Sequence, residues 1–393
     1  ERTAKVEHFN RTGELDVQSN IQFGAGGAGT FSDGKLTTRI HDPMIANVLQ
    51  MLLELGAPED ILWRAKPHIG TGVLVKLVAN ADTVIRSSGG EIRYNCPVTH
   101  IEDNYVIADG EKIPCGVVIL ATGHSARDLY VDLMVSSYTL EAKPFSVGVR
   151  VEHLQSWLNE AMFGALAGDP TLGAAEYQLS HREGERGCYT FCMCPGGEVV
   201  AAASEEGGVV TNGMSRHARD GRNANAAVVV QITPEDFGTH PLDGLEYLDR
   251  LERDAFLLGG ADGTAPASTV GAFLRDEASG RSQSVEPTYR PGVRYTRLSD
   301  CLPGFVSAGV RDGIRAFGRQ LKGYDMEDAV LTAVESRTSS PLRILRDSGM
   351  ESVSHKGLFP VGEGAGYAGG IVSAAVDGIK AAEAIMRIYA PLP

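Results

Sequence analysis

The sequence has 393 residues and a net charge of −14, from 36 basic and 50 acidic side chains. This excess of negative charge argues against non-specific binding to nucleic acid or to an anionic membrane surface. No apolar stretch reaches the roughly 20 residues that a membrane span needs, and six scattered cysteines exclude a disulfide scaffold. We therefore expect a cytoplasmic protein of two or three domains, because domains contain roughly 100–200 residues each.

Helical and strand patterns alternate over the first third of the chain. Apolar spacing and short β-type runs predict, in chain order, helices over 43–55 and 73–88 and strands over 91–95, 98–101 and 105–108. The continuous apolar run Val117–Leu120 is typical of a buried parallel strand. Together these elements predict an α/β layer domain.

The middle of the chain differs, because short β-type runs are separated there by glycine turns. These patterns predict antiparallel strands over 188–194, 198–203 and 209–211, then a helix over 245–258 and a loop over 259–296. A strand over 357–361 and a largely apolar helix over 371–389, expected to be buried, return to the α/β pattern. The expected architecture is an α/β domain interrupted by a β-rich domain.

The segment Gly24–Gly29 matches the dinucleotide fingerprint G-x-G-x-x-G. The fingerprint also needs a buried strand before it and a helix after it, but residues 17–23 are polar and residues 32–34 favour a turn. We therefore reject the Rossmann interpretation and expect no helix to begin here. The glycines fit either an anion-binding loop, with Ser32 and Lys35 as further donors, or a flexible surface loop.

A second glycine-rich loop, residues 362–370, follows a predicted strand and precedes a predicted helix. In that arrangement backbone N–H groups and the positive end of the helix dipole point at one place. Glu363 at the strand end can accept hydrogen bonds from sugar or sugar-alcohol hydroxyls. The strand at 117–120 likewise ends in small residues, at 121–123, which mark the crevice where α/β domains bind ligands. The alternative is that these small residues serve packing alone.

Together these segments resemble the FAD domain of flavoproteins related to glutathione reductase. The strings Phe23–Leu36, Met193–Gly197 and Gly362–Gly370 are similar to a group of bacterial FAD-dependent dehydrogenases, over nearly the whole chain. The resemblance implies FAD as the cofactor and a fold of the α/β class. It divides the chain into an incomplete glutathione-reductase-like FAD-binding domain, residues 1–142 and 346–393, and an inserted β-rich (α+β) domain, residues 143–345.

The resemblance also implies positions along the cofactor. Glu363 would bind the ribityl chain, Val98 would offer its backbone to the adenine, and the helix from Ile371 would point at the pyrimidine edge of the flavin. The other implied contacts lie in the glycine loops and at the strand end: Gly26, Gly27, Ser32, Asp33, Gly34, Lys35, Ala121, Thr122, Gly123, Gly362, Gly364, Ala365, Gly366, Gly369 and Gly370.

Proteins of this group carry an earlier strand–GxGxxG–helix unit, and residue 1 falls just after the place where that unit should end. The resemblance therefore implies either a fragment or a chain that binds FAD weakly. The first hypothesis is an FAD-dependent oxidoreductase that transfers hydride or electrons between a donor, for which NAD(P)H is a candidate, and a small-molecule substrate. The second is a non-catalytic nucleotide-binding protein or an inactive fragment of a flavoprotein.

The remaining chemical groups give weaker signals, and the sequence assigns no catalytic residue beyond a minor candidate, His124. The C-x3-C-x-C spacing of residues 188–194 matches neither a zinc site nor a thioredoxin-type dithiol, so we interpret these cysteines as structural. Cys192 and Cys194 nevertheless share one strand face and can reach a flavin or each other. The basic residues of segment 216–222 fit a salt-bridged loop, or a site for a carboxylate or a nicotinamide phosphate.

Overall fold

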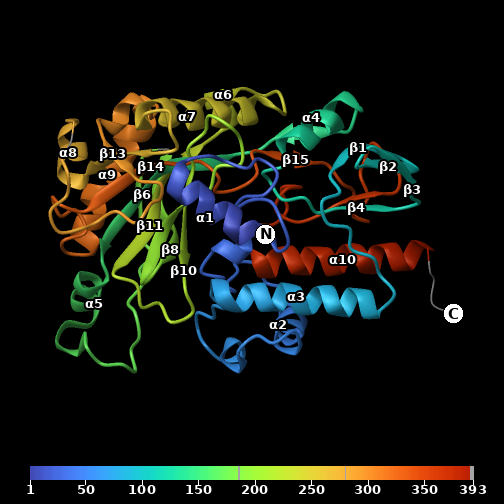
Figure 1. The fold of residues 1–393 in the computed structure, drawn as a ribbon, viewed down its shortest axis with the longest axis horizontal. Helices are drawn as coiled ribbons and strands as arrows, with labels where there is room; N and C mark the ends of the chain where they lie inside the picture. The colour runs from blue at the N-terminus through green and yellow to red at the C-terminus, as the bar shows by residue number, and fades with distance from the viewer. Residues whose placement is uncertain (185, 279, 390–393) are drawn as a thin grey trace.

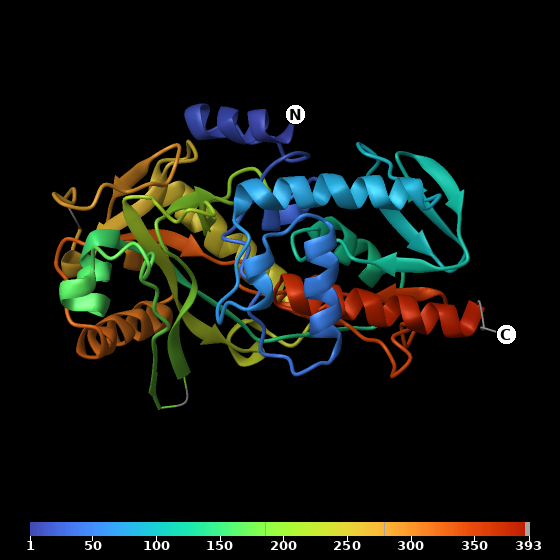
Figure 2. The same cartoon turned by 90° about the horizontal axis from the view of Figure 1, so that it is seen from below.

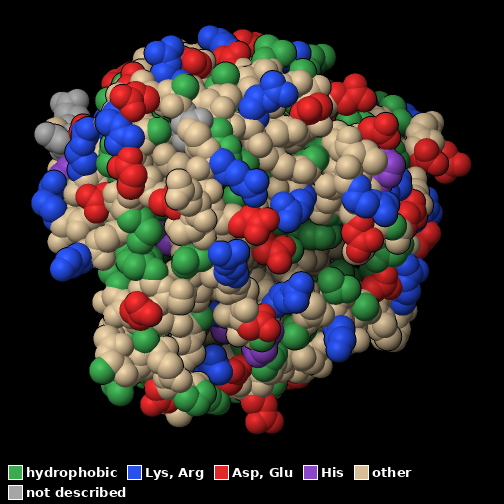
Figure 3. Space-filling model, turned by 60° about the vertical axis from the view of Figure 1, so that its left-hand side comes forward, with side chains coloured by type: hydrophobic (Ala, Val, Ile, Leu, Met, Phe, Trp, Pro, Cys, Tyr) green, Lys and Arg blue, Asp and Glu red, His purple; other side chains and the backbone are tan. Residues whose placement is uncertain are grey.

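A computed structural model describes residues 1–184, 186–278 and 280–389. Figures 1 and 2 show two parts side by side, one around a large sheet from the middle of the chain and one from segments near both ends. None of the helices in the described ranges is long and apolar enough to cross a membrane. Figure 3 shows that acidic and basic side chains are interspersed over one face of the molecule.

A seven-stranded sheet forms the centre of the first part, in the order β13-β12-β14-β6-β11-β8-β7. Its strands are β6 Phe145–Leu154, β7 Ser180–Glu183, β8 Arg186–Cys194, β11 Asn223–Ile232, β12 Ala265–Thr269, β13 Val293–Tyr295 and β14 Val330–Glu335. All neighbours are antiparallel except β12 and β13. The central strand β6 alternates: Val147, Val149 and Val151 face the apolar core, so Arg150 and Glu152 point to the opposite face.

Helices cover the apolar face of this sheet. α7 Asp243–Gly259 and α9 Gly304–Gln320 bury residues at helical spacing against the sheet, such as Leu248 and Leu251 from α7 and Val310 and Ile314 from α9. The shorter helices of this part are α5 Gln155–Phe163, α6 Pro234–Phe237 and α8 Val270–Arg275, with 3-10 turns η3 Gly164–Leu166 and η4 Leu298–Asp300. A separate antiparallel pair, β9 Gly197–Ala201 and β10 Thr211–Ser215, lies beside β8 and β11.

The second part contains three small sheets. β4 Val118–Leu120 and β16 Leu358–Pro360 form a parallel pair, and β5 Leu140–Ala142 and β15 Leu342–Ile344 form an antiparallel pair. A three-stranded antiparallel sheet contains β1 Val98–Glu102, β2 Tyr105–Ala108 and β3 Glu111–Pro114. The helices and 3-10 turns of this part are η1 Gly27–Phe31, α2 Met44–Glu54, η2 Glu59–Leu62, α3 Thr71–Ser87, α4 Arg127–Val135 and α10 Ile371–Tyr389. Helix α1 Arg2–Thr12 packs on the β-rich part through Val6 and Phe9.

Several sequence expectations are wrong in detail. The expected strand at 91–95 has no strand structure, and the expected loop over 259–296 contains β12, α8 and β13. α10 spans the expected residues, but only Val372, Val376, Asp377 and Ala381 are buried along it. Its apolar side chains are largely half-buried or exposed because only one stripe of the helix packs on α2 and α3.

The expected buried strand at Val117–Leu120 is parallel to β16, as predicted, but it is not buried on both faces. Ile119 is 49% exposed, so the face of β4 to which it points is not covered. Within the described ranges β4 also has a strand partner on one edge only. The structure confirms a mixed α/β fold with a large mixed sheet. The glutathione-reductase-like arrangement stays a prediction.

Candidate functional site

The parallel pairing of β4 and β16 brings two of the predicted segments together. Because Leu120 lies opposite Pro360, the chain leaves the two strands side by side, at residues 121–123 and 362–364. A side chain on Gly364 would overlap the carbonyl oxygen of Gly123, so the two backbones can approach this closely only without a Cβ. Gly123 and Gly364 at the two strand ends therefore have a packing role.

Glu363 contributes the carboxylate at this edge. Its Oε1 lies 3.2 Å from Nδ1 of His124, which follows the end of β4. Burial opposes ionisation, but the neighbouring imidazole of His124 and the ammonium of Lys143 hold the pKa of Glu363 below its ordinary value. The Nε2 atom of His124 is buried and has no hydrogen-bond partner among the described residues, so one polar group of the site is left for a ligand or water.

The loop after Glu363 leads to the N-terminus of α10 with an open backbone. Gly369 and Gly370 are exposed, and a Cβ added to either would meet no atom within 4 Å. α10 is anchored to the same loop, because Gly362 N donates to Oδ2 of Asp377 over 2.8 Å. Arg346 clamps that carboxylate with two bonds of 2.7 and 2.9 Å. The positive end of a 19-residue helix thus lies beside sterically open backbone, in which Gly369 N donates to Ser373 Oγ over 3.3 Å.

The other cofactor residues implied at this loop and strand have packing roles. Ala365 and Gly366 are buried, and a Cβ on Gly366 would lie 2.7 Å from the carbonyl oxygen of Leu342. Ala121 and Thr122 are exposed at the end of β4. Glu363, His124 and the backbone at 369–370 present the polar groups at this edge.

The first glycine loop has a different character. It opens no α-helix, as expected, but forms the single 3-10 turn η1 before Ser32 returns to extended backbone. The guanidinium of Arg2 fills the loop and donates to the carbonyl oxygens of Asn20, Ile21, Ala25 and Gly27. The loop therefore presents carbonyl groups to a cation, in place of N–H groups to an anion. A Cβ added to Gly26 would overlap the side chains of Thr30 and Val78.

The residues that follow this loop contact the β-rich part. The Asp33 side chain is 1% exposed and pairs with Lys35 over 3.0 Å and with Arg219 over 2.6 Å. Lys35 Nζ also donates to the carbonyl oxygen of Met193. Ser32 Oγ donates to Gly29 and accepts from Gly34, so its hydrogen bonds stay within the loop. Arg219 agrees with the salt-bridged interpretation of segment 216–222.

The predicted site residues thus separate into three places. Residues 121–123 and 362–371 converge, whereas no hydrogen bond or ion pair between described residues joins segment 26–35 to them. Leu36 and Val372 do share one buried cluster with α2 and α3, which places the two loops on the same helical layer. Val98 begins β1 opposite Ala108 on the separate three-stranded sheet.

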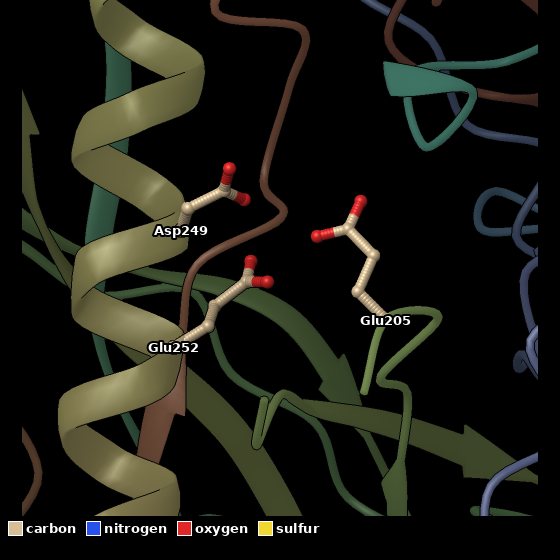
Figure 4. Close-up of side chains that lie close together, drawn as sticks. All are labelled: Glu205, Asp249 and Glu252. Carbon is tan, nitrogen blue, oxygen red and sulfur yellow. The ribbon is translucent and has the colours of Figure 1, made fainter. Parts of the chain in front are cut away.

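Sequence reasoning missed a cluster of charged side chains that joins the two parts of the molecule, in which Glu252 is buried, Glu205 is partly exposed and Asp249 is exposed. Figure 4 shows Glu205, Asp249 and Glu252 with their carboxylates near one another. Arg127 from α4 pairs with all three, at 2.8 Å from Glu205 and from Glu252. Arg337 binds Glu252 over 3.0 Å. Because guanidinium groups already engage these oxygens, we interpret the cluster as an ionic contact between the parts and assign no metal to it.

The converging strand ends suit part of an FAD molecule. An ionised carboxylate can accept hydrogen bonds from ribityl hydroxyls, and exposed backbone at the N-terminus of α10 suits an electron-rich group. The first glycine loop does not suit a pyrophosphate, because Arg2 occupies it. The residues that fit a flavin cofactor are therefore those at 121–124 and 362–371.

Comparisons with known proteins agree with this cofactor. Residues 144–338 match the family described as FAD-dependent protein, C-terminal domain-like. An uncharacterized protein of Clostridium beijerinckii is 47% identical over 396 residues, which cover 99% of this chain and 74% of that protein. The family match confirms the prediction of FAD as the cofactor. The matched range lies within the segment 143–345 that the sequence suggested as an inserted domain.

Two solved structures are more distant. CtdE in complex with FAD is 14% identical with a TM-score of 0.29, over 81% of this chain and 60% of CtdE. An oxidoreductase from Methanosarcina mazei is 15% identical with a TM-score of 0.31, over 85% of this chain and 58% of that protein. The chain thus spans less than two thirds of either solved protein, and at these scores neither likeness carries an argument. On the clostridial relative and the domain match, the chain belongs to a family of FAD-dependent proteins.

Proposed function

We propose that this chain is part of an FAD-dependent oxidoreductase and that the ends of β4 and β16 hold its flavin cofactor. The observation that supports the proposal is the convergence of Glu363, the open glycine backbone and the N-terminus of α10 in a chain of an FAD-dependent family. When bound, FAD would supply hydride and electron transfer, and the protein would bind and orient the cofactor. The β-rich part, residues 143–345, would hold a small-molecule substrate.

The residues of the site would bind and orient the cofactor. Glu363 would accept hydrogen bonds from hydroxyl groups, and His124 would fix the carboxylate orientation through the contact of 3.2 Å. Residues 121–123 would leave room for the cofactor chain beside β4. The positive end of the α10 dipole would stabilise negative charge near Gly369 and Gly370. NAD(P)H remains our proposed electron donor.

The test measures FAD affinity of the chain and of Glu363→Gln by quenching of flavin fluorescence. A charge-assisted hydrogen bond is worth roughly 1.5–3 kcal/mol, and each 1.4 kcal/mol is about tenfold in affinity. We therefore expect Glu363→Gln to bind FAD at least about tenfold more weakly. The matched control is Glu141→Gln, because Glu141 is half-exposed and pairs with Arg343 on a neighbouring strand. Equal affinity for the chain and Glu363→Gln would contradict this assignment.

A second function, binding a nucleotide without catalysis, is favoured by one observation. The glycine loop that would approach a pyrophosphate is filled by Arg2, which predicts weak FAD binding by this chain. Anaerobic addition of NADH or NADPH to the FAD-loaded chain separates the two functions. Bleaching of flavin absorbance followed by its return with an electron acceptor supports the oxidoreductase, whereas stable absorbance with every donor supports simple binding.

A further inference from the structure

Segment 67–70 contacts both residues 33–36 and the turn 216–219 of the β-rich part. Its backbone forms hydrogen bonds of 2.9 to 3.0 Å with residues 33–36. It also approaches the turn so closely that a Cβ on Gly70 would lie 2.5 Å from the backbone nitrogen of His217. Segment 67–70 therefore connects residues 33–36 to the turn 216–219 through backbone contacts.

Two histidines join the two segments reciprocally. His68 Nε2 lies 3.2 Å from the carbonyl oxygen of His217, and His217 Nδ1 lies 3.1 Å from the carbonyl oxygen of Ile69. The two imidazole rings stack, with centroids 5.2 Å apart and planes inclined by 27°. Because a carbonyl oxygen only accepts hydrogen bonds, both of these ring nitrogens carry a proton. In neutral His68 the lone pair is therefore on Nδ1.

The surroundings of His68 do not suit a second proton on its ring. His68 is only 4% exposed, and its Nδ1 is buried with no hydrogen-bond partner among the described residues. The titratable and charged groups that face the ring are His217, Arg219, Lys35 and Asp33. Asp33 is already bound by Arg219 at 2.6 Å and by Lys35 at 3.0 Å. A proton on Nδ1 would therefore be a buried donor without an acceptor, near two cations.

Protonation of His68 is consequently coupled to the closed contact. Burial and the charge of Arg219 lower the pKa of His68 below its ordinary value of 6.5, although the hydrogen bond to His217 opposes this shift. Exposure to water would restore the ordinary pKa. The closed contact therefore has its full stability above about pH 6.5 and is weakened as the pH falls below that value.

We propose that His68 is a pH-sensitive switch, which holds segment 67–70 on the turn 216–219 when neutral and releases it when protonated. The proton comes from solvent and binds Nδ1, and only hydrogen bonds and packing contacts are broken. Because segment 67–70 is bonded to residues 33–36, acid also loosens the segment that the resemblance to flavoproteins places at the cofactor. The switch belongs to the chain itself and does not rest on the proposed flavin site.

Hydrogen exchange measured by mass spectrometry at pH 7.5 and pH 5.5 tests the switch in the whole chain, without added FAD. Exchange is corrected for its intrinsic pH dependence and normalised to β11, which contains no titratable side chain. We expect exchange over segment 67–70 to accelerate several-fold at pH 5.5. The upper limit is about tenfold, because pH 5.5 lies about one unit below the ordinary pKa of histidine.

Three variants identify the titrating group. His68→Gln keeps an amide that can donate to the carbonyl oxygen of His217 but cannot take up a proton, so it should remove the acceleration at pH 5.5. His8→Gln is the matched control, because His8 is exposed on α1 and pairs with Glu14. His217→Gln changes the exposed ring of the stack and should keep the acceleration. Circular dichroism at both pH values confirms that each variant is folded.

The original chain and His217→Gln keep the proposal falsifiable if His68→Gln does not fold. Equal exchange over segment 67–70 at the two pH values in the original chain would overturn the proposal. Loss of the acceleration in His217→Gln would assign the titration to the exposed ring and would overturn it as well. An acceleration in folded His68→Gln equal to that of the original chain would exclude His68 as the switch.

Discussion

At the scale of single residues, charges are placed where opposite charges neutralise them. Glu252 is buried on α7 and accepts from Arg337 and from Ser336 at 2.7 Å, as well as from Arg127. Burial opposes its ionisation, but Arg337 and Arg127 more than compensate and lower its pKa from 4.5 to about 2. The carboxylate is therefore ionised in the folded protein under all mild conditions.

This shift predicts an acid-dependent contribution to stability. Because the folded-state pKa of Glu252 lies below its unfolded value, the stabilisation is complete above about pH 4.5 and is lost as the pH falls toward 2. The shift corresponds to roughly 3 kcal/mol. Urea unfolding should show Glu252→Gln to be less stable by about this amount at pH 7. The exposed Glu246→Gln on the same helix should change stability by under about 0.5 kcal/mol.

The pH dependence of the stability difference tests whether the charge of Glu252 is its cause. The stability difference between the chain and Glu252→Gln should shrink as the pH is lowered from 4.5. A difference of the same size at pH 7 and pH 3 would show that lost packing, rather than the charge, explains the effect of the substitution.

The sequence predicted some site residues because their signal is local. Glu363 follows a strand and precedes glycines, so the neighbouring residues alone predict its position. Arg127 and Glu252 carry no such signal, because they meet across 125 residues of sequence.

At the scale of elements, backbone approach at the ends of β4 and β16 sets the shape of the site. Gly364→Ala would overlap the backbone of Gly123, and overpacking of this kind costs roughly 1–3 kcal/mol. Thermal or urea unfolding should therefore show Gly364→Ala to be destabilised. Gly369→Ala meets open space and should leave stability within about 0.5 kcal/mol. Equal stability of the two variants would contradict the close approach seen here.

Elements with a strong periodic pattern were predicted best. α10 begins and ends at the predicted residues, and α2, α3 and α7 lie within two residues of their predicted bounds. The predicted loop at 259–296 failed because β12 and α8 are short and rich in small residues. Their structure depends on pairing with β14 and on burial, which tertiary contacts supply and local patterns do not.

At the scale of the whole molecule, α4 connects the charge cluster to the strand-end site. Arg127 near its start reaches the acids of the β-rich part. One turn later, Tyr130 donates to the carbonyl oxygens of Gly364 at 2.8 Å and Gly123 at 3.2 Å. Both contacts lie on one helix, so we expect a change at the ionic contact to affect the position of α4 beside the proposed flavin site.

Substitution of Arg127 should weaken the contact between α4 and the acids of the β-rich part. In Arg127→Met the acids lose one cation, and hydrogen exchange measured by mass spectrometry should accelerate in α4 while β6 and β11 keep their protection. Arg387→Met, at an exposed position on α10, is the matched control. Unchanged exchange in α4, or equal acceleration in the central strands, would show that α4 is held in some other way.

The open edge of β4 limits which strands can add to it. Val118 N and Leu120 O bond toward β16, so Ile119 alone directs its N–H and C=O outward along this three-residue strand. A strand that adds to this edge would gain two hydrogen bonds of about 1 kcal/mol each and about 1 kcal/mol from burying the rest of Ile119. This total is smaller than the roughly 4 kcal/mol that corresponds to a millimolar dissociation constant. A freely diffusing strand would therefore not remain bound, and the edge is a poor template for aggregation. A strand tethered nearby would occupy the same edge only at an effective concentration above roughly 10 mM.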